Sequence, residues 1–326
     1  MSSIENLLKD KMGERSEKYP NLETRLKQIT HSWEHNHIEL EGHFYYLTFK
    51  DRNPTIDEFV QLMYDRIADF CLPERIKKEY MEKFLEKMDE RHIYAMRDEA
   101  CDLFIKAKEQ QKKTGEPGEL ALFLLLELGL HAPQIASKMF LKTNVNMPVH
   151  GSDGVHARFN SSTGFLNLIW GESKLYQQLP KALDDICSSI SNFINHEQDG
   201  SIPKERDIKI IKGHLSIEDE DLKRVLLKYF DPYESESNEI EEYFACFVGF
   251  NYYFLRNTER FTREEIVEKF EEKYLQRIKT ACDLFKEKIE NKGIRHLKFI
   301  FFLLPFKDVS EVRMKFYRKL KGGFDE

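Results

Sequence analysis

The residue types best suited to chemistry are two carboxylates and an amine near the middle of the chain. Asp153 lies in a Gly-Ser-Asp-Gly turn, and Glu172 and Lys174 follow a short apolar run. Side chains two residues apart in a strand share a face, so Glu172 and Lys174 are expected to face the pocket that Asp153 enters. Carboxylate oxygens bind divalent cations, and an ammonium group orients water or stabilises negative charge on a phosphate. The pattern therefore indicates a phosphodiester hydrolase.

The neighbours of these residues favour this interpretation. Ile169 and Trp170 place Glu172 at the end of an apolar strand, and Gly171 allows another backbone segment to approach closely. The alternative is a solvated strand face, because a Glu-x-Lys sequence arises readily by chance in a chain of which 33% is charged. The hydrolase interpretation depends on the turn and the strand lying in one hairpin.

A further carboxylate, Glu119, opens an almost entirely apolar helix that is predicted to end at Leu130. One interpretation is a polar group that reaches a metal ion from the helix packed under the sheet. The other is an ordinary first-turn residue that the helix dipole stabilises. Glu127, farther along the same helix, is open to both interpretations, although two helical turns separate it from Glu119.

Composition restricts the class of protein. A chain of 326 residues with 41% hydrophobic and 13% aromatic residues is long and apolar enough for a real core. Its net charge of -7 is unfavourable for binding nucleic acid unaided, so a DNA substrate would need a partner that holds it. Five scattered cysteines, with no secretory signal and no apolar run long enough for a bilayer, predict a cytoplasmic protein without membrane contact.

The order of expected elements is that of an α/β protein with helices packed on a mixed sheet. Strands are expected at 43–50, 155–159, 165–173, 242–255 and 296–306, and helices at 56–70, from 73, and at 91–113, 119–130, 133–139, 183–196, 218–230, 262–291 and 309–320. Residues 142–149 are expected to be extended. The basic and aromatic stretch 313–321 could contact a DNA backbone, but a solvated terminal helix is the simpler expectation.

A loop rich in glycine and proline, 113–118, is the best candidate for a domain boundary. It divides the chain into an N-terminal α/β region, 1–113, and a second region, 114–326. The expected site falls wholly in the second region.

Four blocks in the second region carry a family resemblance. They are Gly118-Glu119-Leu-Ala-Leu-Phe, Ala132-Pro-Gln through Lys138-Met, Gly151-Ser-Asp153-Gly-Val-His156 and Trp170-Gly-Glu172-Ser-Lys174-Leu-Tyr176. In this order they resemble the core of the PD-(D/E)xK nuclease superfamily and, more closely, the HamA family, nuclease effectors of the Hachiman anti-phage defence system. The resemblance is strongest over residues 118–180. It implies a restriction-endonuclease-like core in 114–326 and a partner-binding role for 1–113.

The resemblance also implies roles for individual residues. Asp153 and Glu172 would be metal ligands, Lys174 the catalytic lysine, and Glu119 a helix carboxylate that also serves the metal. The ion would be Mg²⁺, with Mn²⁺ as the alternative. Serine stands before Asp153 where the superfamily name has proline, but the chemistry requires only the carboxylate.

As a family member the chain would cleave DNA together with a helicase subunit, HamB. That complex would restrain the nuclease until infection or DNA damage is sensed. The rival hypothesis is a catalytically silent protein that uses the same fold to regulate a helicase. The presence of Asp153, Glu172 and Lys174 together speaks against it.

Overall fold

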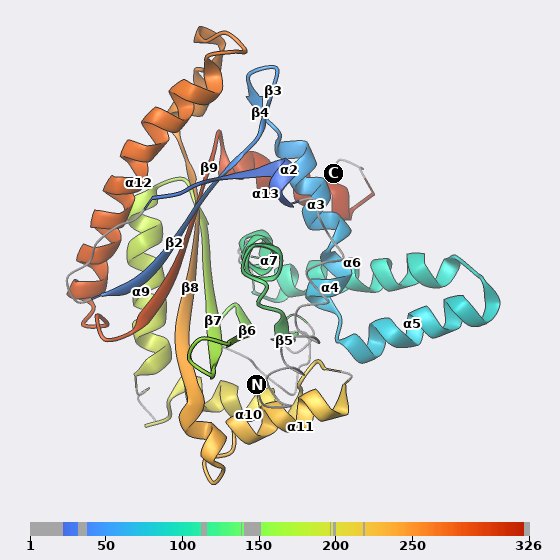
Figure 1. Cartoon of the computed structure of the whole chain (residues 1–326). Helices are drawn as coiled ribbons and strands as arrows, with labels where there is room; N and C mark the ends of the chain where they lie inside the picture. Colours follow the sequence, from blue (N-terminus) through green and yellow to red (C-terminus); the bar gives the residue numbers. More distant parts are fainter. Residues whose placement is uncertain are drawn as a thin grey trace. The chain divides into compact units, whose positions relative to one another are not determined.

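The computed structural model describes residues 22–31, 38–111, 116–137, 139, 151–195, 197, 200–217 and 219–322. The fold is mixed α/β, with a seven-stranded mixed sheet in the order β1-β2-β9-β8-β7-β6-β5 and flanking helices (Figure 1). The predicted fold class is therefore confirmed.

Two compact units make up the chain, and neither is continuous in sequence. Unit 1 takes its described residues from 65–171 and 193–242, and unit 2 takes them from 20–64, 172–192 and 243–326. Strand β7 (Phe165–Tyr176) passes from unit 1 to unit 2 between Gly171 and Glu172. The predicted boundary at 113/114 falls in residues 112–115, outside the described part of the chain. The division into 1–113 and 114–326 stays a prediction.

Unit 2 is built on parallel strands. Strand β9 (Lys298–Phe306) pairs in parallel with both β2 (Glu39–Leu47) and β8 (Ile240–Asn251), and β1 (Leu26–Ile29) pairs antiparallel with β2. Eight of the nine β9 residues are buried, as expected for a central strand covered on both faces. The sequence predicted the β2, β8 and β9 strands because each is an aromatic or β-branched run.

Helices cover the unit 2 strands. In α12 (Ile266–Asn291) the buried residues recur at three- and four-residue spacing, which places one apolar stripe against the sheet. The ring of Phe285 on this stripe lies 4.6 Å from the ring of Phe301 on β9. Figure 1 shows α12 running along the strands. The remaining unit 2 elements are α2 (Leu22–Arg25), β3 (Phe49–Lys50), β4 (Asn53–Pro54), α3 (Ile56–Asp65), α9 (Leu179–Ile194), the 3-10 turns Tyr253–Arg256 and Thr258–Arg260, and α13 (Val309–Leu320).

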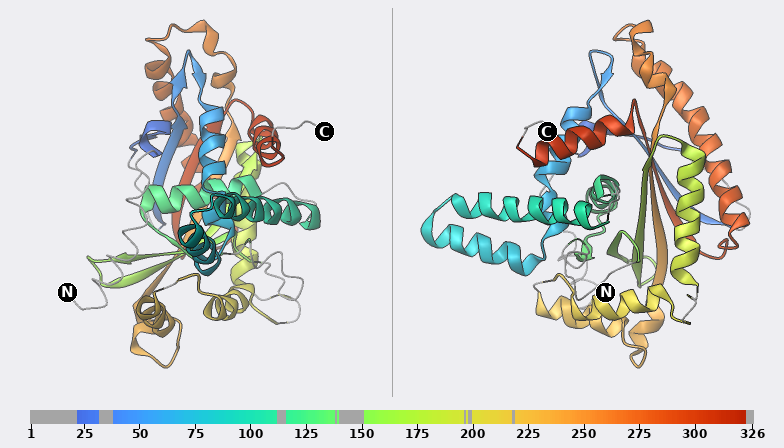
Figure 2. Two further views of the ribbon diagram at one scale, coloured as in Figure 1. Left: turned by 90° about the vertical axis from the view of Figure 1, so that its right-hand side faces the viewer. Right: turned by 180° about the vertical axis from the view of Figure 1, so that it is seen from behind.

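Unit 1 combines the antiparallel strands β5, β6 and the first part of β7 with a group of helices. Its helices are α4 (Ile67–Cys71), α5 (Glu74–Lys87), α6 (Arg91–Gln111), α7 (Glu116–Leu124), α10 (Pro203–Gly213) and α11 (Glu220–Tyr229), with a π-helical turn at Leu125–Gly129 and a 3-10 turn at Ser235–Glu239. Helices α5 and α6 run side by side as a hairpin (Figure 2). Rings of Phe70, Phe104 and Phe123 join α4, α6 and α7, with centroids 5.5–6.1 Å apart.

The short helix expected from Pro133 is wrong. Residues Gln134–Ala136 form strand β5, which is fully buried and pairs antiparallel with β6 (Gly154–Asn160). The Pro133 carbonyl accepts the Ala157 N–H at 3.1 Å, so this proline lies beside a strand rather than opening a helix. The backbone groups of β5 are satisfied by a strand about 20 residues away, which helix propensity cannot reveal. The expected extended segment 142–149 lies outside the described residues.

Candidate functional site

The hairpin of β6 and β7 carries the central residues of the candidate site. The two strands are antiparallel, with Gly154 opposite Gly171 and Asn160 opposite Phe165. Their turn closes through the Gly164 N–H, which donates to the Asn160 carbonyl at 2.8 Å, and Gly164 has a φ of 77° that suits glycine. The predicted hairpin is confirmed.

Asp153 lies just before β6 and is half-buried. Its backbone N–H donates to the Gly171 carbonyl at 2.7 Å. The turn is therefore fastened to the residue directly before Glu172. The Ser152 hydroxyl, 5% exposed, donates to the Gly154 carbonyl at 3.2 Å and steadies the same turn.

Gly171 is a point of close approach within unit 1. A Cβ atom at this position would lie 2.9 Å from Cδ2 of Leu122 on α7 and 3.3 Å from the Gly154 backbone nitrogen. A side chain would therefore have to push the helix or the neighbouring strand away. This confirms the prediction that glycine allows close backbone approach here.

Glu119 belongs to α7, which starts at Glu116, so its place near the first turn agrees with both interpretations of this residue. It is only 8% exposed, which is unusual for a glutamate. The charge of Glu119 also affects a buried thiol. The pKa of Cys71 is raised mainly by burial, with smaller contributions from Cys101 and Glu119. Glu119 and Asp153 both belong to unit 1.

Glu172 and Lys174 belong to unit 2, on the second part of β7. The Lys174 ammonium donates to the Glu172 carboxylate, so the two side chains share one face of the strand as predicted. Their side chains are 11% and 18% exposed, respectively. Burial raises the pKa of the nearby Cys246 thiol, with smaller contributions from Cys187 and Glu172, while Lys174 lowers it. The Glu172 carboxylate and the Lys174 ammonium therefore lie close enough to the buried Cys246 thiol on β8 to shift its pKa.

His156 is a structural residue of unit 1. Burial lowers its pKa to about 4, so the ring is neutral near pH 7. Its Nδ1 lies 2.7 Å from the Ala132 carbonyl oxygen, and its ring packs 5.9 Å from that of Phe123. These contacts indicate that His156 makes a structural hydrogen bond.

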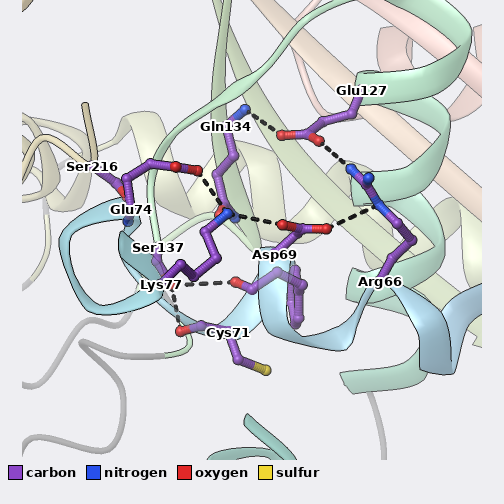
Figure 3. A network of polar contacts seen from close by, with 10 residues as sticks. Arg66, Asp69, Cys71, Glu74, Lys77, Glu127, Gln134, Ser137 and Ser216 are labelled. Carbon is purple, nitrogen blue, oxygen red and sulfur yellow. Dashed lines mark hydrogen bonds and ion pairs between the residues drawn. The ribbon is translucent and has the colours of Figure 1, made fainter. Parts of the chain in front are cut away.

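The ambiguity of Glu127 is resolved by its partners. Its Oε2 accepts from Arg66 Nη2 at 2.9 Å, and its Oε1 accepts from the Gln134 N–H at 3.1 Å. Arg66 also forms an ion pair with Asp69. Lys77 forms ion pairs with both Asp69 and Glu74. Figure 3 shows this chain of contacts linking α4, α5, the π-helical turn and β5. Glu127 thus links elements of unit 1. It lies in the π-helical turn, whereas Glu119 lies in α7, and the two carboxylates have different surroundings.

Sequence analysis missed one cation that the fold brings to β7. Arg313 of α13 donates to the carbonyl of Leu175, the residue after Lys174, across a separation of 138 residues. The only signal in the sequence was a basic and aromatic stretch, which the simpler expectation assigned to solvent.

Two general features complete the description of the site. Within the part of the chain that the structure describes, no set of three or more His, Cys, Asp or Glu residues is grouped so as to hold a metal ion. Nor does that part contain a helix with the length and apolar character needed to cross a membrane.

Comparison with known proteins gives one result. No curated protein matches the chain. A family model described as HamA matches residues 22–320, which is nearly the whole sequence and includes every residue of the candidate site. The strand-borne Glu172 and Lys174, the Asp153 turn and the mixed sheet all fall inside that match. The chain therefore belongs to the HamA family, and with it to the Hachiman anti-phage defence proteins.

Proposed function

We propose that this chain is a metal-dependent deoxyribonuclease, the effector of a two-subunit Hachiman defence complex. The observation that carries the proposal is the pairing of Glu172 with Lys174 on one face of β7, directly after the residue whose carbonyl anchors the Asp153 turn. A surface pair would be solvated, whereas these side chains are mostly buried. Membership of the HamA family supports the same function.

The donor set suits a hard divalent cation. Mg²⁺ is commonly bound through one or two carboxylates together with substrate phosphates and water, so a cluster of three acidic side chains is not required. Asp153 and Glu172 would hold the ion, and Glu119 would contribute directly or through water. The oxygen ligands and the absence of Cys or His in this set favour Mg²⁺ or Mn²⁺ over zinc. When bound, the ion supplies positive charge that stabilises the phosphate in the transition state.

Lys174 has two tasks in the proposed reaction. Its ammonium donates hydrogen bonds to the attacking water or to a non-bridging phosphate oxygen, which orients the nucleophile and offsets developing negative charge. The water oxygen forms a bond to phosphorus while the bond to the leaving sugar oxygen breaks, and the proton lost by water passes to solvent or to the leaving oxygen. Glu172 holds the Lys174 ammonium in place through their ion pair.

The test is cleavage of plasmid DNA by the purified chain with Mg²⁺, and with EDTA as a control. Glu172→Gln should lower the rate by about 10²–10³-fold, because it removes a ligand charge and the partner of Lys174. The matched control is Glu287→Gln on α12, an isosteric change at a side chain that is 57% exposed in the same unit. Undiminished nicking by Glu172→Gln would reject the assignment, and so would cleavage that persists in EDTA.

A partner is part of the proposal. A chain with a net charge of -7 attracts DNA weakly over long distances, so a helicase that already holds DNA would raise the local substrate concentration. We propose that HamB is this helicase and that it restrains cleavage until it moves on infecting or damaged DNA in the cytoplasm. Region 1–113 is the proposed interface.

The rival function is a silent regulator of a helicase. Mixing the chain with HamB and following plasmid degradation with and without ATP separates the two. A nuclease effector should degrade DNA in an ATP-dependent manner that Glu172→Gln abolishes. A silent regulator would change the ATPase rate of the helicase and leave plasmid intact.

A further inference from the structure

Arg277 of α12 is a half-buried cation that packs on an aromatic ring of unit 2. Its guanidinium carbon lies 5.6 Å from the centre of the Phe250 ring, which is buried on β8. Within the residues that the structure describes, no carboxylate forms an ion pair with Arg277, and no oxygen accepts a hydrogen bond from it. The five N–H groups of this guanidinium therefore have no acceptor in the described fold.

The pKa of Arg277 agrees with this isolation. Burial lowers the pKa of the guanidinium, and the phenol of Tyr252 acts in the opposite direction. Lys315 in the same unit is also half-buried, but it pairs with Asp57 at 2.6 Å and with Glu311 at 3.3 Å. A half-buried cation without a counter-charge costs free energy, which an anion bound from solution would offset.

Tyr252, the residue after β8, supplies a second donor beside Arg277. Its ring contacts those of Phe250, Phe270 and Tyr274, with centroids 6.0–6.1 Å apart, so its position is fixed. Burial raises the pKa of Tyr252 to about 12, and Arg277 acts in the opposite direction. The phenol is therefore protonated near pH 7. Among the described residues, none accepts a hydrogen bond from its hydroxyl.

The two donors lie where parallel strands of unit 2 end. Asn251, the last residue of β8, is in register with Phe306, the last residue of β9, and the Tyr252 N–H donates to the Phe306 carbonyl at 2.8 Å. Ligands of α/β sheets commonly bind beyond the carboxyl ends of parallel strands. Arg277 and Tyr252 are both half-buried, so the pair borders solvent at this edge of the sheet.

The chemistry of the two donors favours a phosphate over a carboxylate. A guanidinium presents a planar fork that binds two oxygens of one anion. The Tyr252 hydroxyl comes from a different element and needs a further acceptor. A free phosphate or a phosphate monoester has at least three terminal oxygens and can accept from both groups, whereas the fork alone occupies both oxygens of a carboxylate.

We propose that Arg277 and Tyr252 bind the phosphate group of a small ligand, inorganic phosphate or a nucleotide, at the carboxyl end of β8. The Arg277 guanidinium binds two phosphate oxygens, and the Tyr252 hydroxyl donates to a third. The bound anion supplies the counter-charge that the described fold does not give Arg277. This site does not depend on the proposed nuclease function.

The experiment measures the melting temperature of the full chain in a buffer free of metal ions and phosphate. Inorganic phosphate, dAMP, acetate and a short DNA duplex are added separately, each compared with sodium chloride of equal ionic strength. Phosphate or dAMP should raise the melting temperature by about 3–6 °C at roughly tenfold excess over Kd, and the larger shift identifies the source of the phosphate. A shift with acetate alone or with duplex alone would overturn the proposal, and so would no shift.

Arg277→Met should abolish the shift caused by phosphate. Because no acid partner is lost, its melting temperature without phosphate should be no lower than that of wild type. The matched control is Lys279→Met, which removes one charge from an exposed position two residues along the same helix. This control should keep the wild-type shift, and an equal loss of the shift in both variants would point to net charge rather than to a site.

Tyr252→Phe is the second variant and keeps the test decisive if Arg277→Met does not fold. It removes only a hydroxyl that no described residue binds, so the ring packing and the stability should be unchanged. Its affinity for phosphate, measured by titration calorimetry, should fall by about 2–10-fold, as expected for the loss of one hydrogen bond. Equal affinities for wild type and Tyr252→Phe would remove Tyr252 from the site and overturn the proposal.

Discussion

Each unit of the chain contains an ion pair with little exposure to solvent, and the two pairs differ in what they connect. In unit 1, Arg66 and Glu127 are 61 residues apart and join the residue that precedes α4 to the π-helical turn. In unit 2, Glu172 and Lys174 are two residues apart on one strand, so their contact joins no separate elements. The first pair contributes to the fold of its unit. The second links positions within a single strand.

The two pairs also differ in how far their side chains are exposed to solvent. The Arg66 and Glu127 side chains are 4% and 9% exposed, and both Glu127 oxygens have protein partners. The Lys174 side chain is 18% exposed. The two ion pairs thus differ in the elements that they link and in the exposure of their side chains.

The largest expected effect is on stability in unit 1. Arg66→Met leaves the Glu127 carboxylate buried without its cation and should lower the free energy of unfolding by about 3–5 kcal/mol. Lys174→Met, the matched change in unit 2, should cost less, about 1–2 kcal/mol, because the charged hydrogen bond to Glu172 lies within one strand and joins no separate elements. Urea denaturation followed by circular dichroism measures both. Equal losses would break the comparison.

A double variant checks the cause of that loss. Arg66→Met with Glu127→Leu replaces both charges by apolar groups, so it should recover much of the stability lost in Arg66→Met. If the double variant is no more stable than the single one, packing of the arginine stem rather than an uncompensated charge explains the loss.

The next effect is on activity, and here the unit 2 variant should have the larger effect. Lys174→Met should lower plasmid cleavage by about 10²–10³-fold, equivalent to about 2.7–4 kcal/mol of transition-state stabilisation. The Arg66→Met and Glu127→Leu double variant should cleave within a few-fold of wild type at a temperature where it is folded. Initial rates of supercoiled plasmid nicking provide the measurement. A silent Lys174→Met would remove the functional half of the comparison.

A pH effect tests whether the interior of unit 1 excludes unpaired charge. Burial lowers the pKa of His156 to about 4, against about 6.5 when unfolded. Between these values the unfolded chain binds the proton and the folded chain does not. The stability associated with His156 is therefore complete above about pH 6.5 and is lost as the pH falls towards 4. This contribution is about 3 kcal/mol.

His156→Leu supplies the measurement for that effect. The variant loses the hydrogen bond to Ala132 and should be less stable at pH 7. Its melting temperature should then fall less steeply than that of wild type between pH 6.5 and 4.5. Parallel pH profiles for the two proteins would show that the wild-type loss arises elsewhere.

The smallest effect concerns Gly171, the last residue of β7 that belongs to unit 1. Gly171→Ala should cost about 1–3 kcal/mol of stability, because the new methyl group would lie 2.9 Å from Leu122 and 3.3 Å from the Gly154 nitrogen. Gly213→Ala is the control: it adds the same methyl group in unit 1, with no atom within 4 Å. Equal stability of the two variants would show that α7 moves freely away from the strand.

The local features of this protein could be predicted from its sequence. The β6 and β7 hairpin follows from two apolar runs around Asn160–Gly164, and Glu172 and Lys174 share a face because side chains alternate along a strand. The stripe of α12 and the aromatic run of β9 are equally local signals. Periodicity within about a dozen residues is enough to specify each of them. The metal ligands remain predictions of the sequence and its family.

Only the tertiary structure decided features that depend on distant partners. The segment after Pro133 is a strand because β6 satisfies its backbone, and Glu127 is structural because Arg66 lies opposite it. Arg313 lies beside β7 because α13 brings it to the Leu175 carbonyl. In each case the residue itself is compatible with two roles, and the free energy that selects one comes from contacts made 20 or more residues away along the chain.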